Sequence, residues 1–305
     1  MTELLCTDLD RTLLPNGEQP ESPLARPVLW QLLRHHDIAL AYVSGRDLDR
    51  ILEAIDEYQL PVPDVIVADV GTSIHVPVSG QWQRHGDWDD HIARDWNGLD
   101  SAAIREKLSA FTELQDQEHD RQSRHKRSYY LQRQIDPVAL RQRLDEQLCA
   151  GGIKASLVFS DDPEKGVQLL DVLPRNATKL EAMVHVQKML GIANEATLFS
   201  GDSGNDATAL ASGLPSVTVA NADDATREAV RRLARQNGSE ASCYQAAGSL
   251  PLADGHSLNG NYAAGIVEGL VHFNPSWNAE LLSSEWIKAA IAAQGTPRSP
   301  QSRRA

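Results

Sequence analysis

Short apolar runs that end in polar turns recur toward both ends of the chain. Residues 4–10 read Leu-Leu-Cys-Thr-Asp-Leu-Asp, residues 38–43 lead into Ser44-Gly45-Arg46, and residues 65–70 lead into Gly71-Thr72-Ser73. A strand that is buried on both faces of a parallel sheet is apolar at nearly every position, instead of alternating. We therefore predict a buried strand in each run, with polar residues at its carboxyl end.

Segments with a helical spacing of apolar residues separate these runs. They predict helices over residues 22–34 and 47–58, so that the first part of the chain forms three strand-then-helix units. The same order returns late in the chain, with strands at 196–200 and 216–220 and helices at 179–190, 205–211 and 224–236. Alternation of this kind predicts the α/β class, with a Rossmann-like core in which helices cover a parallel sheet.

The middle of the chain lacks this regular order. Helices are predicted at 101–114 and 138–148, and strands at 155–159 and 167–173. We expect a smaller α+β cap at 80–174, inserted between core parts at 1–79 and 175–273. Residues 274–305 form an extension, with a short amphipathic helix expected at 284–293 and disorder in the Pro-, Ser- and Arg-rich end at 296–305.

The charge balance restricts the partners. The chain has 29 basic and 42 acidic residues and a formal net charge of −13. Such a surface repels nucleic acids and anionic lipids, so neither a nucleic acid nor a membrane is expected as a partner. The N-terminus lacks a signal peptide's basic start and apolar run, and the three cysteines show no paired spacing. These features predict a cytoplasmic protein.

Carboxylates follow the predicted strands. Asp8 and Asp10 follow the first strand, and Asp202 and Asp206 follow the strand at 196–200. Ligands of open parallel sheets bind beyond the carboxyl ends of the strands, so these four side chains should converge there. Like charges that lie so close need a counter-cation, and hard oxygen ligands in this number suit Mg²⁺.

A metal at this edge would also let an acidic protein accept an anionic substrate. Helix N-termini after Ser44 and Ser203 would present backbone N–H groups to a phosphate, and Lys179 would supply a second cation. Simpler explanations exist, because aspartates after a strand often cap turns and helices. An EF-hand is excluded, since Leu13 and Gln19 occupy the positions of its glycine and final glutamate.

At these residues the sequence resembles the haloacid dehalogenase superfamily of Mg²⁺-dependent phosphotransferases. Asp8-Leu9-Asp10-Arg11-Thr12 matches the first motif, D-x-D-x-T, and the other three motifs match at Ser44, at Lys179 and at Gly201-Asp202-Ser203-Gly204-Asn205-Asp206. The resemblance spans about residues 3–273. It implies an enzyme that hydrolyses or transfers phosphoric monoesters.

The resemblance also implies roles for single residues. Asp8 would be the nucleophile that forms an aspartyl-phosphate, and Asp10 the general acid and base. Asp8, the backbone carbonyl of Asp10, and Asp202 would hold Mg²⁺, supported by Ser203 and Asp206. The remaining implied contacts are Thr12, Ser44, Gly45 and Lys179 to phosphate, and Arg46, Lys126, Tyr129 and Asn205 to substrate.

A closer likeness is to the sucrose-phosphate phosphatase branch, which carries its cap between the second and third motifs. The supporting stretches are Asp69-Val70-Gly71-Thr72-Ser73-Ile74, Lys126-Arg127-Ser128-Tyr129-Tyr130 and Leu170-Asp171-Val172-Leu173-Pro174. This likeness implies sucrose 6-phosphate as substrate and a sugar-phosphate synthase as a possible partner. Phosphatases acting on trehalose, mannosylglycerate, glucosylglycerol or mannosylfructose phosphates look alike at this level.

The cap residues do not identify which sugar the substrate contains. Lys126 and Tyr129 are candidate sugar contacts, whereas Trp82, Trp88 and Trp96 are expected mainly in structural roles. The acidic surface is compatible with a compatible-solute pathway in a salty cytoplasm.

Three other functions share features with this sequence. Gly201-Asp202-Ser203-Gly204 copies the nucleophile loop of trypsin-like proteases, but the alternating strands and helices contradict their all-β fold. A sugar phosphomutase would move phosphate instead of releasing it. A non-catalytic sugar-phosphate sensor would not need both the nucleophile Asp8 and the acid Asp10.

Overall fold

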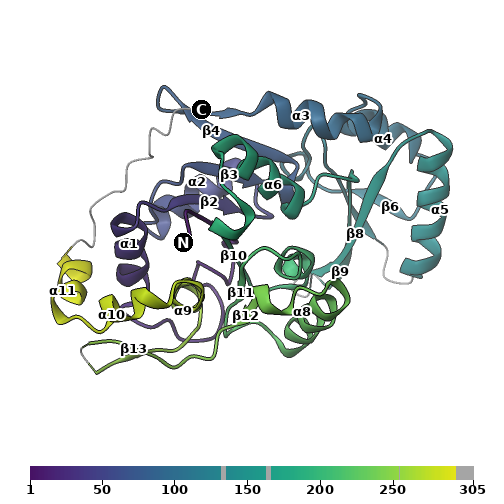
Figure 1. The fold of residues 1–305 in the computed structure, drawn as a ribbon. Helices are drawn as coiled ribbons and strands as arrows, with labels where there is room; N and C mark the ends of the chain where they lie inside the picture. Colours follow the sequence, from purple (N-terminus) through teal and green to yellow (C-terminus); the bar gives the residue numbers. More distant parts are fainter. Residues whose placement is uncertain (132–134, 163–165, 254, 293–305) are drawn as a thin grey trace.

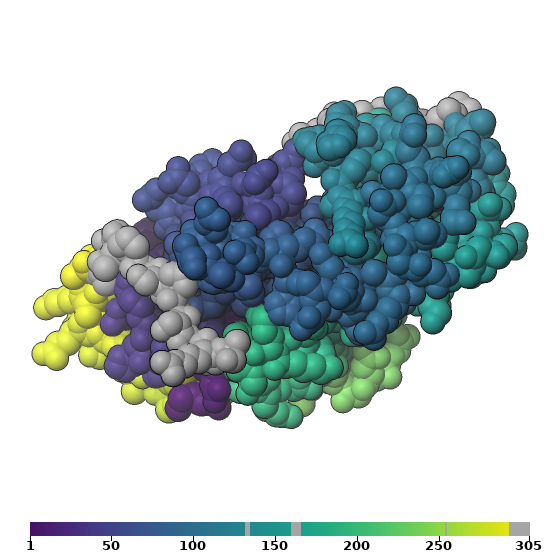
Figure 2. Space-filling model, turned by 90° about the horizontal axis from the view of Figure 1, so that it is seen from above, coloured from purple at the N-terminus to yellow at the C-terminus, as the bar shows by residue number. Residues whose placement is uncertain are grey.

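A computed structural model describes residues 1–131, 135–162, 166–253 and 255–292. The chain forms two lobes, a large core that contains both ends of the described chain and a smaller cap (Figures 1 and 2). The fold is a mixed α/β core with an inserted α+β cap, as the sequence predicts.

The core is built on an eight-stranded sheet with the order β12-β11-β10-β1-β2-β3-β4-β5. The strands from β12 to β3 run parallel, and β1 pairs with β10 on one side and β2 on the other. These strands are β1 (Leu4–Thr7), β2 (Ala39–Val43), β3 (Val65–Ala68), β10 (Thr197–Gly201), β11 (Ser216–Thr218) and β12 (Cys243–Gln245). The central position of β1 places Asp8 at the middle of the sheet edge.

Helices cover both faces of this sheet, and the apolar runs explain why. Within β1, Leu5 packs into one core cluster and Leu4 and Cys6 into the other, so both faces of the strand are buried. One face is covered by α1 (Ala25–His35), α2 (Leu48–Glu57) and α9 (Ala263–Phe273), and the other by α3 (Gly86–Ala93), α6 (Lys179–Leu190), α7 (Ala207–Leu210) and α8 (Asp224–Asn237).

The third predicted strand-then-helix unit is wrong. After β3 the chain makes a short 3-10 turn (Asp69–Gly71) and enters an antiparallel hairpin, β4 (Ser73–Val78) and β5 (Gln81–Arg84), which extends the core sheet. The α3 residue Trp88 packs in the same core cluster as Met183 of α6. Residues 80–93 therefore lie with the core, and the cap begins later than residue 80.

The cap is a four-stranded antiparallel sheet with the order β6-β7-β9-β8, packed against two helices. Its elements are α4 (Ser101–Lys107), β6 (Leu114–Asp116), β7 (Arg127–Leu131), α5 (Pro137–Ala150), β8 (Ala155–Asp162) and β9 (Val167–Pro174). The helix predicted at 101–114 is shorter, because the chain turns into β6. Trp96 and Tyr129 are buried in the apolar layer between sheet and helices.

The extension packs on the core. Its helices, α10 (Asn278–Leu281) and α11 (Ser284–Ala292), lie beside α1 at the end of the molecule opposite the cap, and Trp277 and Ile287 join the core cluster (Figure 1). The disorder predicted at 296–305 falls outside the described residues. The remaining short elements of the core are β13 (Leu250–Pro251) and β14 (Ser257–Leu258). Among the helices of the described residues, none combines the length and apolar composition that crossing a membrane requires.

Candidate active site

The structure brings Asp8 and Asp202 together at the carboxyl ends of two neighbouring strands. Asp8 follows β1 and its N–H donates to Ser200 of β10, while Asp202 directly follows β10. Both side chains are buried. The hydroxyl of Thr12 donates to Asp202 at 3.0 Å, so in this structure Thr12 supports the second carboxylate.

Lys179 is the buried cation of this cluster. Its Nζ lies 3.0 Å from Asp8 and 2.7 Å from Asp206, and the side chain is 3% exposed. Lys179 is the first residue of α6, whose N-cap is the hydroxyl of Thr178. Gly71 permits the close approach of this helix start, since its φ is +101° and a Cβ there would lie 2.8 Å from the Lys179 nitrogen.

Asp206 is held by the turn that follows β10. Its Oδ2 accepts hydrogen bonds from the N–H and the hydroxyl of Ser203, in a capping box at the start of a short 3-10 turn (Gly204–Asp206). A Cβ at Gly201 would lie 2.8 Å from the Asp206 carboxyl carbon. A larger residue at position 201 would therefore push Asp206 away from Lys179.

Burial and mutual repulsion disfavour the charged forms of two of these carboxyls. Burial, with a smaller contribution from Asp206, raises the pKa of Asp8 to about 8 despite the nearby Lys179. Burial and Asp206 likewise raise the pKa of Asp202 to about 6. For Lys179 burial alone would lower the pKa, but Asp206 and Asp8 outweigh it and raise the pKa above its ordinary value. One lysine thus compensates only part of the negative charge.

The donor set fits a divalent cation. Ligand oxygens of Asp8, Asp202 and Asp206 all lie within 4.8 Å of one another, and all three residues are buried. Carboxylate oxygens are the ligands that Mg²⁺ takes. A bound Mg²⁺ would supply the positive charge that Lys179 alone does not provide.

We predict that stabilisation by Mg²⁺ grows with pH. In the metal-free protein Asp8 and Asp202 hold protons up to pH values of about 8 and 6, and these protons must leave before the oxygens bind metal. The rise in Tm on adding Mg²⁺ should therefore increase between about pH 5 and pH 8. Thermal unfolding with Mg²⁺ and with EDTA measures it. An Asp202→Asn variant should show a smaller rise, and an equal rise at every pH in the native protein would contradict the assignment.

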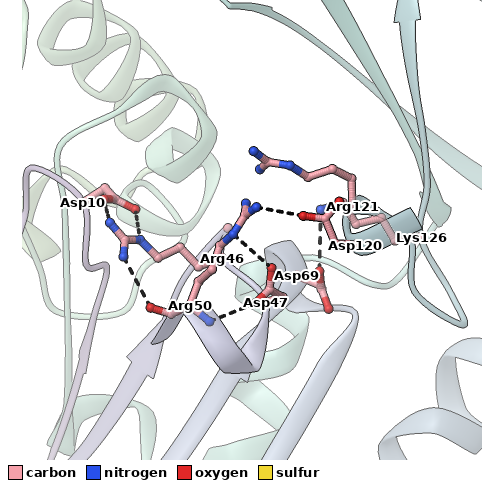
Figure 3. Close-up of a pocket in the computed structure, with 9 residues that line it drawn as sticks. Asp10, Arg46, Asp47, Arg50, Asp69, Asp120, Arg121 and Lys126 are labelled. Carbon is pink, nitrogen blue, oxygen red and sulfur yellow. Dashed lines mark hydrogen bonds and ion pairs between the residues drawn. The ribbon is translucent and has the colours of Figure 1, made fainter. Parts of the chain in front are cut away.

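Asp10 points into a second part of the site, a pocket between core and cap (Figure 3). Arg46 of the loop after β2 binds it with two hydrogen bonds of 2.8 and 2.6 Å, and Asn16 donates a third. Burial favours the neutral acid, but the hydrogen bonds and charge of Arg46 outweigh it and lower the pKa of Asp10. Asp10 is therefore a carboxylate in this structure.

The pocket beside Asp10 has a volume of about 120 Å³ and is strongly charged. The core contributes Gly45, Arg46, Asp47, Arg50 and Asp69, and the cap contributes Asp120, Arg121 and Lys126. Two ion pairs join the lobes across it: Arg50 with Asp120 at 3.1 Å and Lys126 with Asp69 at 3.5 Å. The four cationic side chains are balanced by four carboxylates, those of Asp10, Asp47, Asp69 and Asp120, so the lining can both donate hydrogen bonds to a hydroxyl-rich ligand and accept them from it.

Of the predicted substrate residues, Arg46 and Lys126 line this pocket and two others do not. Tyr129 faces the cap helices, because alternate residues of β7 point to opposite faces of the cap sheet and Tyr129 shares the buried one with Leu131. Asn205 is exposed and accepts a hydrogen bond from Ser203. Ser44 is buried after β2, where its hydroxyl accepts the N–H of Arg46.

Sequence reasoning did not select Arg50, Asp69, Asp120 and Arg121 as site residues. Asp69 follows β3, so the strand-end rule that selected Asp8 could also have found it. Both Asp69 and Val70 have positive φ values, 51° and 62°, which marks a strained turn beside the pocket. Arg50 lies one helical turn beyond Arg46, so its place could have been inferred from that of Arg46. The cap residues Asp120 and Arg121 follow no predicted strand and belong to no motif, so nothing in the sequence selects them.

Asn221 fixes the loop that contains Asp10, Arg11 and Thr12. Its amide donates to the Arg11 carbonyl at 2.5 Å, while its carbonyl oxygen accepts the N–H of Tyr262 at 2.9 Å. Arg11 and Tyr262 both have positive φ values, 57° and 51°, so each needs support from its surroundings. Asn221 is buried and supplies that support from a distant part of the sequence.

We therefore expect Asn221→Ala to lower turnover by roughly 10- to 100-fold, because a small shift of this loop misplaces Asp10. Asn237→Ala is the matched control, since Asn237 also donates to a backbone carbonyl, that of Ala211, away from the site. Asn237→Ala should cost about 1 kcal/mol of stability, and Asn221→Ala more, since Asn221 is buried and makes two hydrogen bonds. Steady-state kinetics and denaturant unfolding distinguish them, and equal turnover in the two variants would contradict the role of Asn221.

Comparison with known proteins identifies the family. The family model described as Sucrose-6F-phosphate phosphohydrolase matches residues 1–274. The chain belongs to this family. It is thus a sucrose-phosphatase-like phosphatase of the haloacid dehalogenase superfamily, which confirms the resemblance seen at Asp8 and Asp202.

Individual relatives carry different descriptions. A putative HAD-like hydrolase of Nitrosococcus oceani is 43% identical over 277 residues, which are 90% of this chain and 73% of that protein. A mannosylfructose-phosphate phosphatase of Agrobacterium fabrum is 30% identical over 203 residues, 67% of this chain and 76% of that protein. The solved sucrose-phosphatase of Synechocystis, in complex with sucrose and phosphate, is 26% identical with a TM-score of 0.68, and the match covers 90% of this chain and 99% of that one.

The plant relatives are longer. The chain spans between 46% and 59% of the length of the tobacco sucrose-phosphatases that it matches. Its extension beyond residue 274 lies outside the family match.

Proposed function

We propose that this protein is a Mg²⁺-dependent phosphatase that hydrolyses the phosphate ester of a disaccharide or glycoside, with sucrose 6-phosphate as the first candidate substrate. The observation that carries the proposal is the contact of Lys179 with Asp8 and Asp206, beside Asp202, in a site that also includes the charged pocket at Asp10. A nucleophilic carboxylate, a buried cation and a set of metal-binding oxygens are the groups that phosphoryl transfer needs.

Asp8 acts as the nucleophile in this proposal. One of its oxygens bonds to phosphorus while the bond from phosphorus to the sugar oxygen breaks, and an aspartyl-phosphate forms on Asp8. Water then attacks the phosphorus, the bond to Asp8 breaks, and inorganic phosphate leaves. Lys179 holds the attacking carboxylate at 3.0 Å and can donate to the phosphoryl oxygens as their charge redistributes.

Asp10 moves the proton in both steps. In the first step it gives a proton to the departing sugar oxygen, and in the second it takes one from the attacking water. The pair with Arg46 keeps Asp10 in the form that accepts a proton. A substrate phosphate that draws the Arg46 guanidinium toward itself removes this interaction, which raises the pKa of Asp10 and lets it arrive protonated.

The cap residues would bind the sugar and close the site. Lys126 and Arg121 project from the cap into the pocket, where they can donate to hydroxyl groups (Figure 3). Closure of the cap would exclude bulk water while the aspartyl-phosphate forms. The relative from Agrobacterium fabrum gives mannosylfructose phosphate as the second candidate, and glucosylglycerol and mannosylglycerate phosphates belong in the same test.

Phosphate release from a panel of sugar phosphates tests the proposal. The panel contains sucrose 6-phosphate, mannosylfructose, glucosylglycerol and mannosylglycerate phosphates, trehalose 6-phosphate and an aryl phosphate, each with Mg²⁺ and with EDTA. We expect Mg²⁺-dependent release, with one sugar phosphate preferred. Release from the aryl phosphate alone would retain the chemistry and reject the substrate class. No release from any compound would reject the phosphatase in favour of a phosphomutase or a sensor.

A further inference from the structure

Two histidines and a glutamate meet where the extension packs on the core. His35 is the last residue of α1, His36 follows it, and Glu280 belongs to α10. One ligand atom of each lies within 4.8 Å of the other two, and the His36 Nε2 lies 3.0 Å from the Glu280 Oε2. The site lies at the end of the molecule opposite the cap, so it is separate from the catalytic carboxylates (Figure 1).

The composition of this group differs from that of the catalytic carboxylates. Two imidazole nitrogens and one carboxylate oxygen are the donors that Zn²⁺ takes, whereas Mg²⁺ takes oxygens alone. With bonds of about 2.0–2.1 Å, ligand atoms on a tetrahedral Zn²⁺ lie roughly 3.3 Å apart. The His36 and Glu280 atoms are already near that spacing. His35 is exposed, so its ring can turn toward the same point.

The surroundings favour a cation at this place. His36 stacks on the buried Trp277, with ring centroids 3.9 Å apart and an angle of 9° between the planes, which holds the imidazole in one orientation. Both histidines lie at the C-terminus of an 11-residue helix, which is the negative end of the helix dipole. The side chains of His36 and Glu280 are 12% and 24% exposed, so an ion from solvent can reach them.

We propose that His35, His36 and Glu280 form a Zn²⁺ site that fastens the extension to the core, with water completing the coordination. Glu280 and Trp277 belong to the extension beyond the family match, whereas both histidines belong to the part within it. A bound ion would therefore join these two parts of the chain at the contact of α1 with α10 and α11. The site does not depend on the proposed phosphatase activity.

Spectroscopy with Co²⁺ in place of Zn²⁺ tests the site on the full-length protein, stripped with EDTA and then supplied with excess Mg²⁺. A tetrahedral site containing nitrogen ligands gives Co²⁺ strong visible absorption, whereas an octahedral all-oxygen site gives weak absorption. We expect one equivalent of Co²⁺ to produce the strong absorption and Zn²⁺ to abolish it by displacement. Zn²⁺ should also raise the Tm and slow hydrogen exchange in residues 275–292.

Three variants complete the test. Glu280→Gln and His35→Ala should lose the strong Co²⁺ absorption and the rise in Tm, and His35→Ala leaves the stack of His36 on Trp277 in place. His119→Ala, which changes an exposed histidine of the cap, should retain both. Absence of the absorption in the native protein, or its persistence in Glu280→Gln and His35→Ala, would overturn the proposal.

Discussion

Asp8→Asn should reduce phosphate release by about four orders of magnitude or more, the largest effect that we expect from any single substitution in this chain. The amide is not a nucleophile that can form the aspartyl-phosphate, so the first covalent step cannot take place. The shape of the side chain is retained, and the amide oxygen can still accept the hydrogen bond from Lys179. The loss should therefore appear in turnover and not in folding.

Stability gives this prediction a second readout. Since burial raises the pKa of Asp8 to about 8, a neutral side chain at this position costs the metal-free protein nothing at pH 7, and its Tm in EDTA should not fall. Asp90→Asn, an exposed substitution in α3, is the control and should leave turnover unchanged. Substantial phosphate release by freshly purified Asp8→Asn would reject the covalent mechanism.

The strands of the core could be predicted because strands that are buried on both faces are apolar at nearly every position. Strands such as β2 and β3 are apolar throughout, and polar residues of the site, Ser44 and Asp69, follow their ends. The helix predicted at 179–190 has the same bounds in the structure, Lys179–Leu190, where Thr178 caps its start and Gly191 its end. In these segments the local sequence signals and the packing of the fold favour the same secondary structure.

The hairpin after β3 could not be predicted in the same way. The run from Ser73 to Val78 is buried only in its first half, since β4 leads toward the sheet edge, and β5 is partly exposed. In β5 only Trp82 is apolar, so the sequence gives no sign that this segment extends the core sheet. The burial of Trp88 against α6 became evident only from tertiary structure, because one aromatic residue carries no information about which lobe it joins.

The site residues that the sequence did not reveal are placed by contacts between segments that lie far apart in the chain. Tyr129 and Lys126 are three positions apart, yet Lys126 reaches the catalytic pocket and Tyr129 lies under the cap helices. Asn221 supports Arg11 from 210 positions away. Strand-end and motif rules locate residues that perform chemistry, but they do not locate residues that act by holding another loop in place.

Lys179→Met should remove activity and also destabilise the fold, which separates it from Asp8→Asn. The substitution leaves the buried carboxylate of Asp206 without its cation, and breaking a buried ion pair in this way costs about 3–5 kcal/mol. Mg²⁺ should restore part of the lost stability, because it supplies positive charge to the same carboxylate, but not the turnover, because the donor to the phosphoryl group is absent. Denaturant unfolding with Mg²⁺ and with EDTA, together with phosphate release, measures both effects.

Lys188→Met, an exposed change in the same helix, is the control. If Lys179→Met unfolds at the same denaturant concentration as the native protein in EDTA, the carboxylates do not need Lys179 as their counter-charge, and the electrostatic account of this site is wrong.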